Sequence, residues 1–418
     1  MRRVPAEPAT EWPETLDVRA LLTGGWRPEP FREFVLKIHS RCDLACDYCY
    51  MYTMADQSWR TRPKQMSPTI AEQAAARIGE HVRRHAIGDI RLVLHGGEPL
   101  LAGPDLISRL VAAVRGAVGD QVRVHASVQT NGVGLDEEYL ALFSGLGVHV
   151  GVSLDGAADA QDRHRRFASG RGSHQAVTAG LRRLSSERYR HLFNGLLCVI
   201  DLRNDPMATY EALLAFGPPA VDFLLPHGTW ESPPPGRLPD NADTPYADWL
   251  IAVFDHWYRE PRTQVRLFAE IIRLLLGRPA DTESVGLAPA SFVVVETDGT
   301  IEQADTLKAA FHGAARTGLN VARDSFDDAL MLPGVAARQL GDQALSDECR
   351  KCTIWRVCGG GLYAHRYRPG TGFANPSVYC PDLMRLISHI RETVAADIAL
   401  RLERRGLERR GPERRENA

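Results

Sequence analysis

Three cysteines in one short loop constrain this chain more than any other feature. Cys42, Cys46 and Cys49 follow the strand-like run 34–39 with the spacing C-x3-C-x2-C. Three thiolates on one turning segment can bind three irons of a cubane iron-sulfur cluster, which normally takes four protein ligands. The missing ligand leaves one iron open, so the spacing favours a cluster that acts on a small molecule. A zinc site with His39 as the fourth ligand is the alternative.

Composition excludes several classes of protein. Of the 418 residues, 44% are hydrophobic and 24% are charged, which is typical of a globular protein, and a net charge of -2 argues against binding to nucleic acid. No apolar run approaches the ~20 residues that span a bilayer, and the N-terminus lacks the apolar core of a signal peptide. We therefore expect a cytoplasmic protein with no membrane or nucleic-acid partner, whose cysteines are metal ligands and not disulfides.

An alternation of β-branched runs and amphipathic stretches begins at Phe34. Six strand-helix units predict an α/β fold with a parallel sheet that curls into a partial (β/α)6 TIM-type barrel, with ligands at the carboxyl ends of its strands. The predicted strands are 34–39, 90–95, 122–129, 148–154, 193–201 and 220–225. The predicted helices are 67–86, 104–118, 135–145, 173–186 and 207–215, followed by 245–258 and 264–276.

The last third of the chain is of another kind. An Asp-Gly turn at 298–299 predicts a hairpin, and four more cysteines, Cys349, Cys352, Cys358 and Cys380, supply a complete set of thiolates for a second metal. Structural zinc fits these ligands as well as an iron-sulfur cluster does. The predicted division of the chain is an N-terminal arm 1–30, a barrel 31–226, a linker with bridging helices 227–285, a cysteine-bearing domain 286–390, and a C-terminal helix with a basic tail 391–418.

The loop Cys42 to Cys49, with Tyr48 before its last cysteine, resembles the signature of the radical S-adenosylmethionine (SAM) superfamily. The resemblance implies a [4Fe-4S] cluster on Cys42, Cys46 and Cys49 that binds SAM and yields a 5'-deoxyadenosyl radical. It also implies that SAM is contacted at the ends of the following strands. The residues that it points to are Tyr48, Gly96, Gly97, Glu98, Pro99, Asn131, Ser153, Asp155 and, among three neighbouring arginines, Arg165.

Each of these motifs also has a plainer interpretation. The alternative for the stretch 95–99 is an ordinary strand-to-helix turn, and Asn131-Gly132 reads equally as a turn that closes a strand. The basic run 162–167 is typical of a solvated face. Cys198, in the apolar stretch 196–200, is expected to be a core residue and nothing more.

The four later cysteines resemble the SPASM extension, which carries auxiliary [4Fe-4S] clusters in radical SAM enzymes that modify peptides. Leu362 stands where a full SPASM has a further cysteine, so the resemblance implies one auxiliary cluster. Stretches 31–39, 55–60 and 295–299 look like the FxsB-type maturases, which form cyclophane crosslinks in ribosomally made precursor peptides. A flavodoxin- or ferredoxin-type electron donor is implied as well. Alternatives are a maturase that forms thioether or ether crosslinks, a sulfatase-activating oxidase, and a zinc-stabilised binding protein.

Asp305 is the candidate catalytic residue. Similar SPASM enzymes carry an acidic residue at this place, after the hairpin, and a carboxylate desolvated there is expected to have a raised pKa and to accept a proton. The alternative is that Asp305 caps a helix that begins at Thr306.

Overall fold

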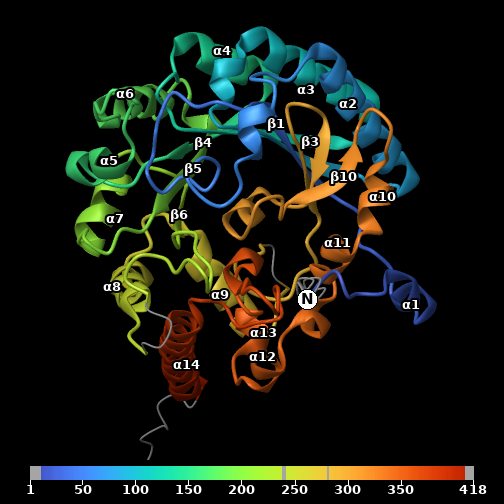
Figure 1. Cartoon of the computed structure of the whole chain (residues 1–418). Coiled ribbons are helices and arrows are strands. Elements are labelled where there is room, and N and C mark those ends of the chain that lie inside the picture. Colours follow the sequence, from blue (N-terminus) through green and yellow to red (C-terminus); the bar gives the residue numbers. More distant parts are fainter. Residues whose placement is uncertain (1–10, 238–241, 280–281, 410–418) are drawn as a thin grey trace, which may run out of the picture.

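A curved sheet of ten strands forms the centre of the molecule, in a computed structural model that describes residues 11–237, 242–279 and 282–409 (Figure 1). Its strand order is β10-β9-β8-β1-β2-β3-β4-β5-β6-β7. The strands are β1 (Glu33–His39), β2 (Asp89–Gly96), β3 (Arg123–Thr130), β4 (Val148–Ser153), β5 (Phe193–Val199), β6 (Ala220–Leu224), β7 (Gln264–Val265), β8 (Phe292–Val295), β9 (Thr300–Glu302) and β10 (Arg316–Asn320).

Strands β1 to β7 lie side by side in chain order and pair in parallel. Crossovers of one hand that advance by one strand each place the connecting helices on one face of the sheet. Helices α2 to α7 accordingly form an outer arc around the strands (Figure 1). The two ends of the strand order are not paired with each other in the described residues, so the barrel is partial, as predicted.

The helices begin at capping signals that are legible in the sequence. Ser67 precedes Pro68 at α2, Asp205 precedes Pro206 at α7, and each capping side chain accepts a hydrogen bond from a backbone N–H of the first turn. The α-helices are α1 (Val18–Thr23), α2 (Pro68–Arg84), α3 (Pro104–Val118), α4 (Glu137–Leu146), α5 (Ala158–His164), α6 (His174–Leu184), α7 (Pro206–Leu214), α8 (Pro245–Arg259), α9 (Arg266–Leu275), α10 (Phe326–Leu330), α11 (Pro333–Ala337), α12 (Asp347–Lys351), α13 (Trp355–Cys358) and α14 (Cys380–Arg409). Among the short 3-10 helices, η2 (Pro99–Ala102), η4 (Asp305–Ala309) and η6 (Tyr363–Arg366) lie near the site described below.

The six predicted barrel strands and the predicted helices are confirmed, each with both ends within two residues of the prediction. Helix α5 was not predicted, because it is short and polar and shows no apolar periodicity. The helix predicted at 264–276 begins at Arg266, since Gln264 and Val265 pair with β6 as a strand.

The hairpin of the last third joins the barrel sheet. Strand β8 pairs in parallel with β1, and β9 and β10 follow it in antiparallel pairing. The sheet therefore runs across the domain limit that we predicted at residue 286. The rest of the C-terminal part consists of helices α10 to α14, and α14 begins at Cys380 and packs against α8 and α9.

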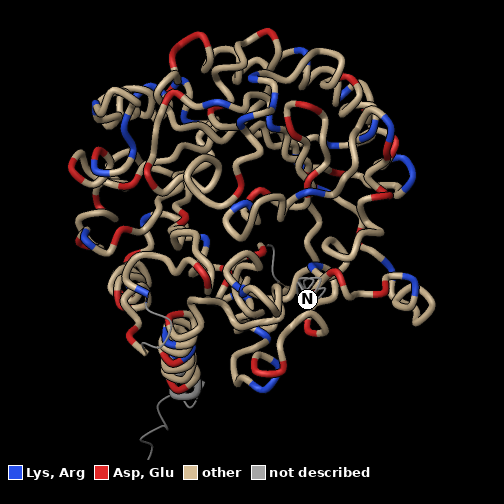
Figure 2. The backbone as a smooth tube through the Cα atoms, viewed as in Figure 1, with Lys and Arg blue, Asp and Glu red and all other residues tan. Residues whose placement is uncertain are grey.

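One apolar core extends from Phe31 to Val394 and so joins the barrel to α14. Cys198 is fully buried in it, which confirms the core interpretation of this cysteine. The described part of the N-terminal arm contains α1 and no strand, and residues 1–10 and 410–418 of the predicted arm and tail lie outside the described residues. Basic and acidic residues alternate over the outer helices in the view of Figure 2. Within the described residues, no helix has the length and apolar character needed to cross a membrane.

Candidate active site

A cavity of about 370 Å³ lies at the carboxyl ends of the parallel strands. It is lined by the ends of β2 to β6, by the loop after β1, and by residues of the C-terminal part. The three cysteines predicted to bind the first cluster all line it, and in the described residues none of them forms a disulfide. The fold therefore places Cys42, Cys46 and Cys49 at the position that the loop spacing predicts for a ligand-binding cluster.

The cysteine loop is held by backbone contacts. Ala45 N–H donates to the carbonyl of Arg166 at 2.7 Å, and Arg41 donates to the carbonyl of Trp59 at 2.8 Å. The Asn131 amide donates to the Asp43 carboxylate at 2.7 Å and lies 3.6 Å from the Cys42 sulfur. Donors aimed at a sulfur favour its thiolate form, which is the form that binds iron.

Burial raises the pKa of the Cys46 thiol to about 11. The guanidinium of Arg165, in the same cavity wall, acts in the opposite direction. A buried thiol of this kind becomes a thiolate when a cation binds it, so the loop fits a metal cluster better than it fits free nucleophilic cysteines.

The Gly-Gly-Glu-Pro turn after β2 packs directly against this loop. A Cβ atom on Gly97 would lie 1.8 Å from the Tyr52 hydroxyl oxygen and 2.6 Å from the Arg41 backbone, so only glycine fits. Gly96 and Gly97 both line the cavity, and Pro99 begins η2. The glycine therefore allows this turn to pack closely against the cysteine loop.

Glu98 is almost completely buried, and its carboxylate is engaged within the protein. It accepts hydrogen bonds from Thr130 Oγ1 at 2.7 Å, from Asn131 N–H at 2.7 Å and from Leu100 N–H at 3.0 Å. Burial raises the pKa of Glu98 to about 7. The visible role of this residue is to tie the end of β2 to the end of β3, and a contact of its side chain with SAM stays a prediction.

Tyr48, Asp155 and Arg165 form a connected group at the ends of β4 and β5. The Tyr48 hydroxyl donates to the Asp155 carboxylate, and Arg165 donates to the Tyr48 oxygen at 3.0 Å. Asp155 also accepts the Val199 N–H at 3.1 Å, and burial raises its pKa. Ser153 lines the cavity and accepts a hydrogen bond from the Gln129 amide at 3.1 Å.

Among the three candidate arginines, Arg165 alone lines the cavity within the described residues. Arg163 forms an ion pair with Asp201, and Arg166 donates to the carbonyl of Asp162. Arg165 is buried, and its Nε atom has no partner in the described residues, so it remains available to an anionic ligand. Its contact with the carboxylate of SAM stays a prediction.

Asp305 does not have the properties that we expected. Its carboxylate pairs with the Lys37 ammonium, and the Tyr50 hydroxyl donates to it at 3.0 Å. Burial alone would raise the pKa of Asp305, but the charge of Lys37 holds it well below its usual range. The expected raised pKa is wrong because β1 places Lys37 beside it.

The alternative role of Asp305 is wrong as well. The 3-10 helix η4 begins at Asp305 itself, the residue at its cap position is Ala304, and no side chain caps it. Asp305 is therefore a buried ion-paired carboxylate that reaches the cavity wall through Tyr50.

A buried group of four charges, which sequence reasoning missed, holds the hairpin on the cysteine loop. Arg62 pairs with Glu296 and Glu302, and Lys308 pairs with the same two carboxylates. All four side chains are at most 6% exposed. The group links the segment after the cysteine loop to β9 and η4, so it also positions Asp305.

The four later cysteines lie around one second cavity of about 370 Å³. Burial raises the pKa of Cys358 to about 11 and that of Cys380 to about 12, and the neighbouring thiols add to both shifts. Gly359, Gly360 and Gly361 all have positive φ, and their carbonyls accept hydrogen bonds from Arg366. Four converging thiols fit one [4Fe-4S] cluster, as the resemblance to the SPASM extension implies.

Leu362 has a place of its own in this arrangement. It stands where a full SPASM has a cysteine, and its side chain lines the central cavity and not the second one.

The central cavity also contains polar groups that the sequence did not single out, namely Asp222, His227, Arg266 and His365. They come from segments without a recognisable motif, so no sequence signal pointed to them.

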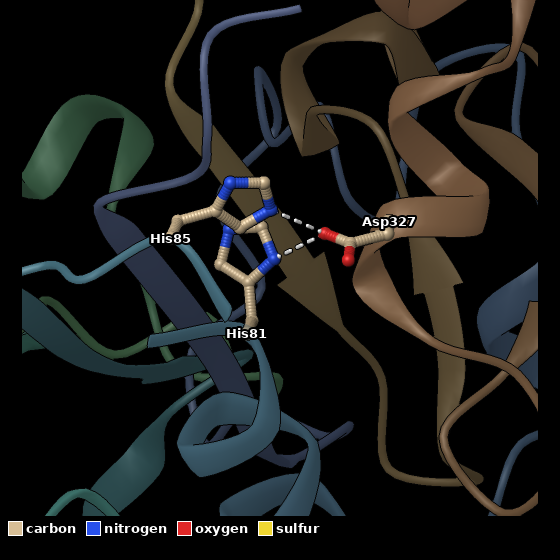
Figure 3. Close-up of side chains that lie close together, drawn as sticks. All are labelled: His81, His85 and Asp327. Atoms are coloured by element: carbon tan, nitrogen blue, oxygen red, sulfur yellow. Dashed lines mark hydrogen bonds and ion pairs between the residues drawn. The ribbon is translucent and has the colours of Figure 1, made fainter. Parts of the chain in front are cut away.

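Two histidines and an aspartate form a separate cluster on the outside of the barrel (Figure 3). His81 of α2 and His85, the residue after this helix, contact the same carboxylate oxygen of Asp327 at 2.7 and 2.8 Å, and Arg84 contacts its other oxygen at 2.9 Å. Three such groups could hold a metal ion, but hydrogen bonds and the Arg84 charge already satisfy the carboxylate. We interpret the cluster as a set of hydrogen bonds that holds α2 and α10 together.

Residues 36–212 match the model of the radical SAM superfamily. A serine-type anaerobic sulfatase-maturating enzyme from Klebsiella aerogenes is 27% identical over 359 residues, which are 81% of this chain and 81% of that enzyme. The structure of native anSMEcpe with bound AdoMet and Cp18Cys peptide has a TM-score of 0.71 and 21% identity, over 88% of this chain and 99% of that one. Streptococcus suis SuiB bound to the precursor peptide SuiA has a TM-score of 0.57 and 13% identity, over 87% and 78%.

The sequence match spans most of β1 and the whole of β2 to β5, and the structural likeness extends over most of the chain. The region 36–212 matches the radical SAM superfamily, and the chain is an enzyme whose cofactors are a [4Fe-4S] cluster and S-adenosylmethionine.

Proposed function

We propose that this enzyme modifies a ribosomally made precursor peptide by forming a cyclophane crosslink, in which an aromatic ring is joined to the β-carbon of a nearby residue. The observation that carries the proposal is the central cavity. One wall holds the three-cysteine loop, and much of the rest is formed by apolar side chains from β5, β6 and the C-terminal part, including Leu197, Phe223, Leu362 and Leu383. Such a cavity suits an aromatic side chain of a peptide.

The known proteins support a peptide substrate. The sulfatase-maturating relative acts on a protein, and two structural neighbours are described with a bound peptide. The resemblance of stretches 31–39, 55–60 and 295–299 to FxsB-type maturases, together with the reduced set of cysteines, favours the cyclophane product over the others.

When bound, the cluster and SAM would supply the radical chemistry that removes a hydrogen atom from the substrate. Cys42, Cys46 and Cys49 hold the cluster in this proposal, and Arg165 faces the carboxylate of SAM. Other residues are proposed to contact SAM, directly or through neighbouring groups. They are Tyr48, Gly96, Gly97, Glu98, Pro99, Asn131, Ser153 and Asp155. Of these, Glu98 and Asp155 act by fixing their neighbours, since protein groups already occupy their carboxylates.

Asp305 accepts the proton that the aromatic ring releases when its aromaticity is restored. Tyr50 lines the cavity and donates to Asp305, so the proton passes through the Tyr50 hydroxyl. Joining the β-carbon to the ring leaves a ring-centred radical, which regains aromaticity by losing one electron and one proton. The auxiliary cluster on the later cysteines would accept the electron, and the oxidised ring carbon is then a strong acid, so a carboxylate with a low pKa suffices as the base. Lys37 keeps the carboxylate ionised until then.

Cys349, Cys352, Cys358 and Cys380 hold one auxiliary [4Fe-4S] cluster in this proposal, and a flavodoxin- or ferredoxin-type protein supplies electrons. We propose five parts of the chain, with the limits 1–30, 31–226, 227–285, 286–390 and 391–418.

Sulfatase-type oxidation of a serine or cysteine is the second candidate. It is favoured by the Klebsiella aerogenes relative, which matches four fifths of this chain. The two reactions give different products, because oxidation leaves an aldehyde on one residue, whereas crosslinking removes two hydrogens and joins two residues.

The test is an anaerobic reaction of the reconstituted enzyme with SAM and a reductant. One substrate is the peptide encoded by a short reading frame beside the gene, and the other is the Cp18Cys peptide of the structural neighbour. We expect the first peptide to lose two hydrogens, to resist fragmentation between the joined residues in tandem mass spectrometry, and to give no adduct with a hydrazine. A hydrazine-reactive product from either peptide would establish the oxidase instead.

A further inference from the structure

Two imidazoles in the wall of the central cavity have no role in the chemistry described so far. His227 follows β6, and His365 belongs to η6 of the C-terminal part. Their ring centroids are 5.5 Å apart, and His227 lies 4.8 Å from the ring of Tyr50. Because Tyr50 contacts Asp305, the pair borders the place where the proposed proton transfer occurs.

Each of these two rings has a buried nitrogen atom without a hydrogen-bond partner in the described residues. His365 is 3% exposed, and its Nε2 atom is buried without a partner in the described residues. The Nδ1 atom of His227 is buried without a partner as well. Buried polar atoms are nearly always hydrogen-bonded, and both residues line the cavity, so the missing partners are expected on a molecule inside it.

Both rings are uncharged at neutral pH. Burial lowers the pKa of His227 to about 4 and that of His365 well below its ordinary value, and Arg366 beside His365 acts in the same direction. A neutral imidazole carries one N–H donor and one acceptor nitrogen. It therefore matches a group that also offers both, such as a peptide amide, and it gives no charge to pair with an ionic group.

We infer that His227 and His365 bind an uncharged amide of the peptide substrate, next to the side chain that enters the cavity. This inference rests on the proposed function and adds to it the part of the substrate that is recognised. The surrounding wall is mostly apolar, so a few polar groups of this kind fix the orientation of the ligand. The pair thus sets which residue of the peptide faces the cysteine loop.

The test measures binding of small probes to the reconstituted holoenzyme with SAM, by calorimetry. The probes are N-acetyl-L-phenylalaninamide, which has a ring and two amides, and 3-phenylpropionate, which has a ring and a charge. We expect the amide to bind about tenfold or more tightly than the carboxylate, and His365→Leu to lose most of that difference. His365→Gln, which keeps a donor and an acceptor, is expected to retain it.

Controls separate recognition from folding. His125 is exposed on β3, and His125→Leu is expected to bind both probes as the wild type does. His227→Leu provides a second test if His365→Leu loses iron or melts early. Equal affinity for both probes in the wild type, or unchanged affinity of the amide in both leucine variants, overturns the inference and leaves only water on these atoms.

The probes do not react, so the measurement is independent of the product. If the wild type crosslinks no peptide but prefers the amide through His365, the proposed reaction fails and the recognition of an amide stands. If it crosslinks the peptide and both leucine variants do so with an unchanged KM, the recognition fails and the reaction stands.

Discussion

The carboxylate of Asp305 lies between a cation and a phenol, and these two contacts give it different tasks. The Lys37 ammonium keeps it ionised, and the Tyr50 hydroxyl connects it to the cavity. His95 contacts the same ammonium at 2.9 Å, and burial lowers the pKa of this imidazole to about 4. The group therefore carries one positive and one negative charge and can take up one further proton.

We expect Asp305→Asn to retain cleavage of SAM and to lose most of the crosslinked peptide. Asparagine has the same size but cannot accept the proton, and it leaves Lys37 without its counter-charge. The measurement is the ratio of 5'-deoxyadenosine to crosslinked peptide under single-turnover conditions. Tyr50→Phe is the matched variant and is expected to raise the same ratio. Crosslinking by Asp305→Asn at the wild-type rate would rule out the base role.

At the level of single residues, sequence patterns predicted the cavity contacts better than they predicted electrostatics. The three cysteines, Gly96 and Arg165 all line the central cavity, because the motifs record which loop follows which strand. The pKa of Asp305 was predicted with the wrong sign, since it depends on Lys37, which is 268 positions away in the sequence. The imidazole of His365 was missed for the same reason.

At the level of elements, a buried group of four charges joins the segment after the cysteine loop to the hairpin. Its members are Arg62, Lys308, Glu296 and Glu302. Two cations and two anions balance there, and burial together with Glu296 raises the pKa of Glu302. Removing one partner leaves an unbalanced buried charge, which is far more costly than removing a pair.

We expect Glu302→Gln to lower the free energy of unfolding by about 3 kcal/mol or more. The double variant Arg62→Met with Glu302→Met removes one charge of each sign and is expected to lose less than Glu302→Gln alone. Chemical denaturation of the reconstituted protein measures both. A loss below about 1 kcal/mol in Glu302→Gln would mean that the group is solvated and contributes as little as a surface ion pair.

The cluster of His81, His85 and Asp327 between α2 and α10 makes the free energy of unfolding depend on pH. Burial lowers the pKa of His81 below the ordinary value of about 6.5, although Asp327 opposes the shift. The unfolded chain therefore takes up a proton at a higher pH than the folded chain does. As the pH falls below about 6.5, the unfolded state gains protons first and the free energy of unfolding decreases.

His81→Phe keeps a ring beside Phe31, Phe34 and Phe326 but removes the titration. At pH 7.5 we expect this variant to be less stable than the wild type by about 1 kcal/mol, for the lost hydrogen bond to Asp327. Between pH 7 and 5 the difference is expected to shrink, because the wild type alone loses the contribution of His81. Denaturation at several pH values measures this, and His125→Phe should follow the wild-type curve. A difference that stays constant over this range would contradict the assignment.

The sequence patterns predicted the helices and strands well, but they did not predict how distant strands pair. Barrel strands and helices have local signals, such as β-branched runs and Ser-Pro or Asp-Pro caps, and these were found within two residues. The pairing of β8 with β1 joins segments more than 250 positions apart and leaves no local trace in either one. Helix α5 was missed because its burial comes from tertiary contacts and not from a periodic apolar face.

At the level of the whole molecule, the two cysteine groups occupy separate cavities that share no lining residue in the described part of the chain. The barrel and the C-terminal part nevertheless share one apolar core, and residues after position 360 complete the central cavity. Loading of one metal site is therefore expected to be independent of the other, whereas the product depends on both.

Because the two sites are separate, a cysteine-to-alanine substitution is expected to affect SAM cleavage differently at each site. We expect wild-type protein to contain about eight irons per chain, and both Cys46→Ala and Cys352→Ala to contain about four. Cys46→Ala removes a ligand of the site that faces SAM, so it should form no 5'-deoxyadenosine. Cys352→Ala leaves that site intact, so it should still form 5'-deoxyadenosine while giving no crosslinked peptide. Cys198→Ala, in the core of β5, is the control and should keep the full iron content. Formation of 5'-deoxyadenosine by Cys46→Ala, or zinc in place of iron at the second site of the wild type, would contradict the assignment of the two sites.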